Sequence, residues 1–185
     1  IKEYIKKNCP KRAVIMGGGF IGIEMAENLM HAGVETSLLQ RRDQILPPLD
    51  YDMACELHAH LREKGLDLRF RTNPERFTEK DGRLFVELTG GDAIVCDMAV
   101  LAIGVRPDTK LAKDAGLTLG MKDAIVTDTH MRTSDPGIYA AGDAVEVRQI
   151  VTGAKAVIPL AGPANKQGRI AADNICGIVS EYKGA

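Results

Sequence analysis

The sequence predicts an α/β fold in which a central parallel β-sheet, with helices on both faces, is followed by a β-meander and then by a smaller, less regular part. Residues 11–104 alternate between short β-branched runs and stretches with helical spacing. A glycine-rich turn over residues 17–22 joins the first run to the first helical stretch. After Val105 the alternation gives way to short apolar runs between polar turns. Alternating strands and helices favour parallel sheets, so we expect one domain over residues 1–105 and a second part over 106–185.

The first half begins with a helix-like stretch, IKEYIKKN, and a strand over residues 11–16, KRAVIM. Residues 20–31 predict a helix that Gly33 stops. Four apolar side chains recur there at helical spacing and are expected on one face: Ile21, Met25, Leu29 and Met30. A second strand follows over residues 34–39, VETSLL.

The rest of the chain continues in the same manner and then becomes irregular. Asp50 is expected to cap a helix that runs to Lys64 and is ended by Gly65. The next strands read LDLRF (66–70), RLFVEL (83–88) and AIVCDMAVLAIG (93–104), with a Gly90-Gly91-Asp92 turn between the last two. After a linker over 105–109 we expect a short helix at 111–116, short strands across 124–143, and a final helix from Ala164 to about Val179 with Pro163 in its first turn.

The composition restricts the class of function. The chain has 185 residues, 45% of them hydrophobic and 26% charged, and a net charge of −1. It lacks the basic field that nucleic-acid binding requires. No apolar run approaches the ~20 residues of a membrane span and no signal peptide is visible, so we expect a cytoplasmic protein without a membrane partner. The cysteines are interpreted as small buried hydrophobic residues with no bound metal, because Cys9, Cys55, Cys96 and Cys176 have neither metal-ligand nor redox-pair spacing.

The turn GGGFIG is typical of a dinucleotide site. Gly17, Gly19 and Gly22 form the pattern G-x-G-x-x-G, with Gly18 inside it, between a strand and a helix. The first glycine allows the tight turn, the second lets a pyrophosphate approach the backbone, and the third lets the helix pack close to the strand. The helix N-terminus then offers free N–H groups to the phosphates. Such patterns also arise by chance, as ordinary strand-to-helix turns.

The end of the second strand bears on which coenzyme would bind. An acid is expected there for the adenosine ribose, but the strand ends in Gln40, followed by Arg41 and Arg42, with Asp43 too far along to serve. A neutral amide does not repel a 2′-phosphate and two arginines attract one, which favours NADPH over NADH. Gly22 favours NADH, since NADPH enzymes of this type often carry alanine there. The arginines are also compatible with a solvated surface loop.

A second informative segment, TSDPGIYAAGDA, covers residues 133–144, roughly a hundred residues after the glycine turn. With the first segment it makes the whole chain resemble the middle of the pyridine nucleotide-disulfide oxidoreductases. The stretch IPLAGPANKQGRIAADNI, residues 158–175, resembles the branch of coenzyme A-disulfide reductase, NADH oxidase, NADH peroxidase and persulfide reductases. The resemblance implies a Rossmann-like NAD(P)-binding domain with a parallel sheet and a β-meander over 1–105, and an incomplete second segment of an FAD-binding domain over 106–185.

The resemblance also implies roles for individual residues of the first domain. Phe20 matches the aromatic residue that lies over the flavin, Ile21 a residue near the nicotinamide, and Glu24 a carboxylate that binds the carboxamide. Arg41 matches a phosphate-binding position, and Ala102 to Gly104 a strand end whose backbone passes the nucleotide. From the residues alone, Phe20 is equally compatible with a helix core and Glu24 with a solvated first-turn acid.

In the second part, the resemblance places Asp143 at the hydroxyls of the flavin ribityl chain or near its phosphates. Pro159, Leu160 and Ala161 match a turn whose backbone meets the flavin ring, and the helix after them would aim its positive end at that ring. A turn-forming or helix-capping acid is the alternative for Asp143. Lys166 and Arg169 add positive charge to that helix, or are simply solvated.

For the parent protein the resemblance implies an FAD-dependent NAD(P)H oxidoreductase. Hydride would pass from nicotinamide to flavin and on to a disulfide, persulfide, peroxide or oxygen. The redox cysteine belongs upstream and a homodimerisation domain downstream, so we assign no catalytic residue here and expect no bound FAD in this chain. The start at Ile1 is read as a cut inside a longer chain. A ferredoxin- or rubredoxin-reductase-like flavoenzyme and a non-catalytic nucleotide-binding module are the alternatives.

Overall fold

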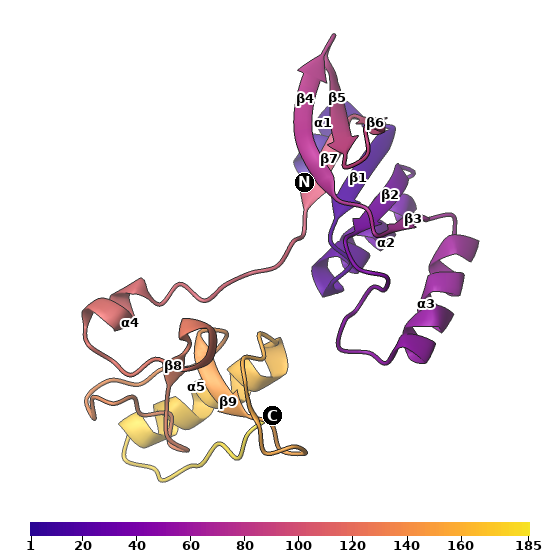
Figure 1. The fold of residues 1–185 in the computed structure, drawn as a ribbon. Helices are drawn as coiled ribbons and strands as arrows, with labels where there is room; N and C mark the ends of the chain where they lie inside the picture. The colour runs from indigo at the N-terminus through magenta and orange to yellow at the C-terminus, as the bar shows by residue number, and fades with distance from the viewer. The chain divides into compact units, whose positions relative to one another are not determined.

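The computed structural model describes all residues, 1–185, and divides them into two compact units, Ile1–Gly104 and Val105–Ala185. Each unit is described separately below (Figure 1).

The first unit contains a parallel sheet and an antiparallel one. Its elements are α1 (Lys2–Asn8), β1 (Arg12–Met16), α2 (Phe20–His31), β2 (Glu35–Gln40), α3 (Tyr51–Glu63), β3 (Asp67–Phe70), β4 (Pro74–Lys80), β5 (Arg83–Leu88), β6 (Ala93–Cys96) and β7 (Met98–Leu101). The parallel sheet has the order β3-β2-β1-β7 and the antiparallel meander the order β4-β5-β6. The central parallel sheet and the β-meander predicted from the sequence are therefore confirmed.

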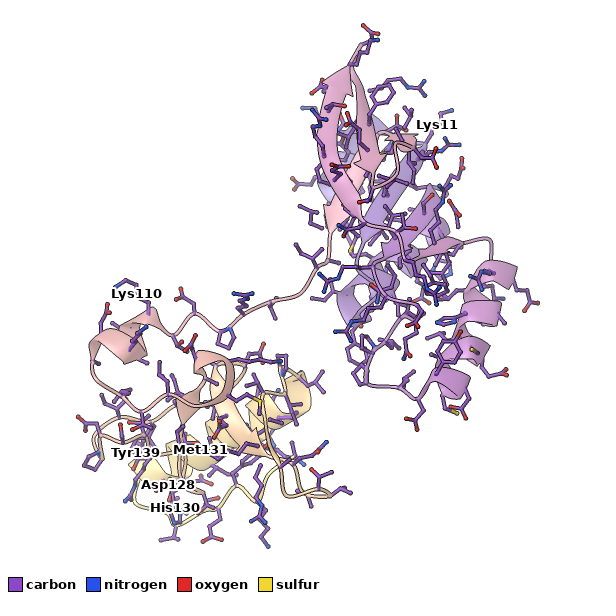
Figure 2. All side chains as sticks on the ribbon, in the orientation of Figure 1. Lys11, Lys110, Asp128, His130, Met131 and Tyr139 are labelled. Atoms are coloured by element: carbon purple, nitrogen blue, oxygen red, sulfur yellow. The ribbon has the colours of Figure 1, made fainter.

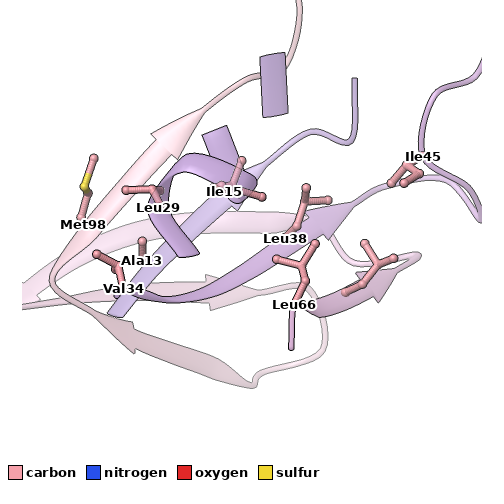
Figure 3. Close-up of a cluster of buried hydrophobic side chains, with 10 residues drawn as sticks. Ala13, Ile15, Leu29, Val34, Leu38, Ile45, Leu66 and Met98 are labelled. Carbon is pink, nitrogen blue, oxygen red and sulfur yellow. The ribbon is translucent and has the colours of Figure 1, made fainter. Parts of the chain in front are cut away.

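The two faces of the parallel sheet are covered differently. One hydrophobic cluster joins alternate residues of β1 and β2, such as Ile15 and Leu38, to α2 and to the loop residue Ile45; its members are drawn in Figure 3. A second cluster joins the intervening residues, such as Val14 and Leu39, to the meander. Helices on both faces were expected, and this was wrong. Strands β1, β2 and β3 lie next to one another in the sheet in the order of the chain. Right-handed connections between them therefore put α2 and α3 on the same face of the sheet. The other face is left to the meander.

Three details of the first unit differ from expectation. The face that α2 buries consists of Gly22, Ala26 and Leu29, while Ile21 is 56% exposed. Asp50 holds the N-cap position of α3 but its side chain makes no capping hydrogen bond. Strand β4 was not predicted from the sequence, because most of its side chains are polar and exposed. It forms through pairing with β5, with a register shift between Pro74 and Arg76.

The second unit has little regular structure. Its elements are α4 (Lys110–Asp114), a 3₁₀ turn (Met121–Asp123), β8 (Ile125–Val126), β9 (Val145–Arg148), β10 (Lys155–Ala156) and α5 (Ala161–Ile175). Of the strands expected across residues 124–143, only Ile125–Val126 is present. The remaining residues form turns and one isolated antiparallel bridge between Arg132 and Tyr139, in the region where Asp128, His130, Met131 and Tyr139 are labelled in Figure 2. Helix α5 begins three residues before the predicted start and ends at Ile175, ahead of the predicted Val179.

The cysteines are all free thiols, but they are not all buried. Cys96 lies in the second cluster of the first unit, and burial raises the pKa of its thiol. Cys55 is half-buried, whereas Cys9 and Cys176 are exposed, so the expectation of four buried cysteines holds only for Cys96. Among the helices, none has both the length and the apolar character needed to cross a membrane.

Candidate nucleotide-binding site

The glycine loop has a shape that side chains would prevent. Gly17 has φ of +109°, and a Cβ on it would lie 2.3 Å from the Ala102 carbonyl oxygen. A Cβ on Gly22 would lie 1.8 Å from the Gly17 carbonyl oxygen, since α2 crosses directly over the loop. A Cβ on Gly19, by contrast, would meet no atom within 4 Å. Gly17 and Gly22 are thus required by the fold itself, and Gly19 leaves open space at the start of the helix.

The N-terminus of α2 presents a set of unpaired donors. The N–H groups of Gly19, Phe20, Ile21 and Gly22 donate to no acceptor of the chain, and the first intrahelical bond runs from the Ile23 N–H to the Gly19 carbonyl, 3.1 Å. The first turn carries no acidic residue, so nothing offsets the positive end of the helix dipole. This arrangement suits an anion such as a pyrophosphate.

Gln40, at the end of β2, faces the loop and not the solvent. It is 8% exposed, and its Oε1 accepts a hydrogen bond from the Gly18 N–H at 3.3 Å. Its Nε2 donates to the Gln44 carbonyl at 2.7 Å. Arg41 and Arg42, the next two residues, are both exposed.

The other candidate residues of the first unit lie around the same loop. Phe20 and Ile21, the first two residues of α2, are 55% and 56% exposed, so the helix-core interpretation of Phe20 is wrong. Glu24 is exposed on the second turn of α2, and not on the first. The Ala102 N–H donates to the Met16 carbonyl, which sets the end of β7 beside Gly17. Gly104 follows two residues later with φ of +106°.

In the second unit, the segment ending in Asp143 meets the beginning of α5. The Gly142 N–H donates to Oε1 of the buried Gln167 at 2.7 Å. Asp143 is exposed and its side chain makes no hydrogen bond within the chain. Pro159, Leu160 and Ala161 are also exposed at the N-terminus of α5. The structure therefore brings together the four flavin-side candidates of the sequence, on one unit.

Sequence reasoning missed three residues that shape these regions. His58 in α3 and Ile45 in the preceding loop fix the segment after β2, and Gln167 fixes the segment before Asp143. The only signal in the sequence is a polar residue one helical turn from a small apolar one, His58 four residues after Ala54 and Gln167 four before Ala171, and it does not say what the residue binds.

Comparison with known proteins gives a consistent family match. The family model of the pyridine nucleotide-disulphide oxidoreductases matches residues 2–168. The CoA-dependent NAD(P)H sulfur oxidoreductase of Pyrococcus abyssi is 35% identical over 100% of this chain and 41% of its own length. The reduced CoADR-RHD of Bacillus anthracis is 45% identical with a TM-score of 0.93, over 100% of this chain and 33% of that one.

One further structure was solved with a coenzyme in place. The water-forming NADH oxidase of Lactobacillus brevis, bound to NADH, is 31% identical with a TM-score of 0.90, over 99% of this chain and 41% of that one. An engineered variant of it, bound to NADPH, has the same TM-score. The chain thus spans less than half the length of each relative.

Proposed function

This chain belongs to the pyridine nucleotide-disulphide oxidoreductase family, and on that premise we propose that it is the NAD(P)-binding domain, residues 1–105, and the second FAD-binding segment, residues 106–185, of an FAD-dependent NAD(P)H oxidoreductase. The observation that carries the proposal is the row of four unpaired N–H groups from Gly19 to Gly22 over open space. The first N–H groups of a helix have no intrahelical acceptor and are completed by water or by a ligand, and an anion in the open space beside Gly19 would accept from them.

In this proposal the glycine loop, Gly17 to Gly22, holds the coenzyme pyrophosphate. Ala102 and Gly104 border it through their backbone, and the exposed Phe20, Ile21 and Glu24 contact the nicotinamide half. The 55% exposure of Phe20 supports this role, since an aromatic ring of the core would be buried. When bound, the nicotinamide supplies a hydride, and the residues named here bind and orient it.

For the coenzyme we propose NADPH ahead of NADH. Gln40 adds no negative charge at the strand end, and the exposed Arg41 and Arg42 are able to pair with a 2′-phosphate. Gly22 is the residue that favours NADH. The relatives include both an NADH-bound and an NADPH-bound form.

On the flavin side we propose that Asp143 accepts hydrogen bonds from flavin hydroxyls and that Pro159, Leu160 and Ala161 border the ring. The residues fit this use: Asp143 has an unengaged carboxylate, and the Ala161 and Gly162 N–H groups at the α5 N-terminus have no acceptor in the chain. When bound, the flavin would supply the redox chemistry between the nicotinamide and a disulfide, persulfide, peroxide or oxygen acceptor, and Asp143 with residues 159–161 would hold it. A homodimeric, cytoplasmic parent protein is part of the same proposal.

A nucleotide titration tests this proposal. We expect the 185-residue chain to bind NADPH and NADH in calorimetry, and Gly19→Ala to abolish measurable binding, because the added methyl enters the space that the phosphates need. Gly19 has φ of −83° and no neighbour within 4 Å, so the variant should unfold at no lower a urea concentration than the wild type. Failure of both coenzymes to bind at millimolar concentration, or unchanged binding by Gly19→Ala, would contradict the proposal.

A further inference from the structure

The segment after β2, residues 41–49, is hydrogen-bonded to the glycine loop and packed against it at Gly18. The Leu46 N–H donates to the Gly18 carbonyl at 2.7 Å. The Ile45 side chain lies so close over Gly18 that a Cβ there would be 2.5 Å from its Cγ2. Gln40 bridges the two segments through its hydrogen bonds to the Gly18 N–H and the Gln44 carbonyl. The segment that starts with Arg41 and Arg42 and the loop proposed to hold the pyrophosphate therefore form one connected surface.

A histidine of α3 holds this segment from the other side. His58 is only 4% exposed, and its Nε2 accepts a hydrogen bond from the Ile45 N–H at 3.3 Å. Its ring lies against the Phe70 ring of β3, with centroids 4.5 Å apart, and meets the Tyr51 ring edge-on at 6.4 Å. A histidine nitrogen accepts a hydrogen bond only when it carries no proton, so this contact exists only for the neutral ring.

The surroundings of His58 favour that neutral form. Burial, followed by the nearby positive charge of Arg62, lowers the pKa of His58 below its ordinary 6.5. Arg62 and Tyr51, both on α3, are the charged and titratable side chains that face the ring; β3 contributes the Phe70 ring and the loop the Ile45 N–H. No carboxylate accepts a hydrogen bond from the ring or raises its pKa.

We propose that His58 is a positioning residue of the nucleotide site, which holds residues 41–49 against the glycine loop and releases them when it gains a proton. The inference rests on the proposed function and deepens it, because it makes nucleotide binding dependent on pH through a residue that does not touch the nucleotide. Gln40 is the second positioning residue, since both polar atoms of its buried side chain are engaged within the chain.

The direction of the effect follows from the chemistry of the contact. A protonated ring presents N–H groups at both nitrogens, so at Ile45 a donor would face a donor. Since the histidine pKa is lower in the folded chain, the contribution of the contact is complete above about pH 6.5 and is lost as the pH falls through the folded value. Loss of the hydrogen bond from Ile45 to His58 frees the segment that carries Arg41 and Arg42, and the affinity for the nucleotide falls as a result.

Calorimetric titration with NAD⁺ at about pH 7.5 and at a lower pH, chosen where the His58 ring is protonated in the folded chain, tests the proposal. NAD⁺ avoids the 2′-phosphate of NADPH, which itself titrates near pH 6. For the wild type we expect about a fivefold loss of affinity at the lower pH. His58→Gln, whose amide oxygen accepts the Ile45 N–H without titrating, should show no such loss. His58→Leu, which cannot accept it, should bind weakly at both values.

His60→Gln is the matched control, because His60 is exposed on the same helix, and it should keep the wild-type pH dependence. If His58→Gln retains the wild-type pH dependence, or if folded His58→Leu binds as the wild type does, the proposal is overturned. Should His58→Leu fail to fold, the comparison of His58→Gln with the wild type decides.

A second readout separates this inference from the proposed function. The Ile45 amide should be protected from hydrogen exchange in the wild type and in His58→Gln, and unprotected in His58→Leu, whether or not nucleotide binds. If the wild type binds no nucleotide, the proposed function fails while amide protection still reports on the contact. Equal protection in all three chains would refute the positioning role.

Discussion

Replacing Gly22 by alanine should destabilise the first unit, although alanine is the better helix former. The added Cβ would lie 1.8 Å from the Gly17 carbonyl oxygen, whereas Cβ atoms in folded proteins stay beyond about 3 Å of such atoms. The start of α2 must therefore move by more than about 1 Å. Overpacking of this kind costs about 1–3 kcal/mol, and the helix preference of alanine returns about 1 kcal/mol. We expect a net loss of up to about 2 kcal/mol in the free energy of unfolding.

Gly168→Ala is the matched control, because Gly168 lies inside α5 and a Cβ on it would meet nothing within 4 Å. The same substitution should there stabilise its unit by about 0.5–1 kcal/mol. Urea unfolding, monitored by hydrogen exchange with mass spectrometry, reports on the two units separately and gives the change in free energy of unfolding for both variants. If Gly22→Ala also stabilised its unit, the close approach of α2 to the loop, and with it the structural reason for the third glycine, would be refuted.

Two further predictions concern charge. Arg41→Ala should weaken NADPH binding about tenfold or more and leave NADH binding unchanged, because a phosphate–guanidinium contact is worth about 1.5–3 kcal/mol. The control Arg83→Ala removes the same charge from the meander and should change the affinity for neither coenzyme. Equal losses of affinity for both coenzymes with Arg41→Ala would contradict the NADPH preference. Glu146→Gln should make the second unit less sensitive to acid, because the Met121 N–H and then Lys155 lower the pKa of the buried Glu146 carboxyl below 4.5. The stability that these Glu146 contacts provide is present above about pH 4.5 and is lost as the pH falls through the folded-state pKa of Glu146. An acid titration of unfolding checks this. Glu181→Gln, at an exposed position, is the control and should retain the acid sensitivity of the wild type.

Elements with a strong local pattern could be predicted from the sequence. The bounds of α2, Phe20 to His31, follow from helical spacing between a glycine turn and Gly33, and the structure has the same bounds. Strand β4 could not be predicted, since its polar residues form a strand only where β5 supplies a partner. The buried face of α2 was misjudged for a similar reason: close packing selects the small Gly22 and Ala26 and leaves the larger Ile21 exposed.

The α/β fold, the glycine turn between its first strand and helix, and the family could all be predicted from the order of the residues. Those features are local: they depend on periodicity and on which residues tolerate a positive φ or a close helix. Three features are visible only in the folded chain: the meander covers the second face of the sheet, Gln40 turns inward to Gly18, and His58 accepts a hydrogen bond from Ile45. What a polar side chain bonds to depends on the segments that folding brings beside it, and residue spacing along the chain does not contain that information.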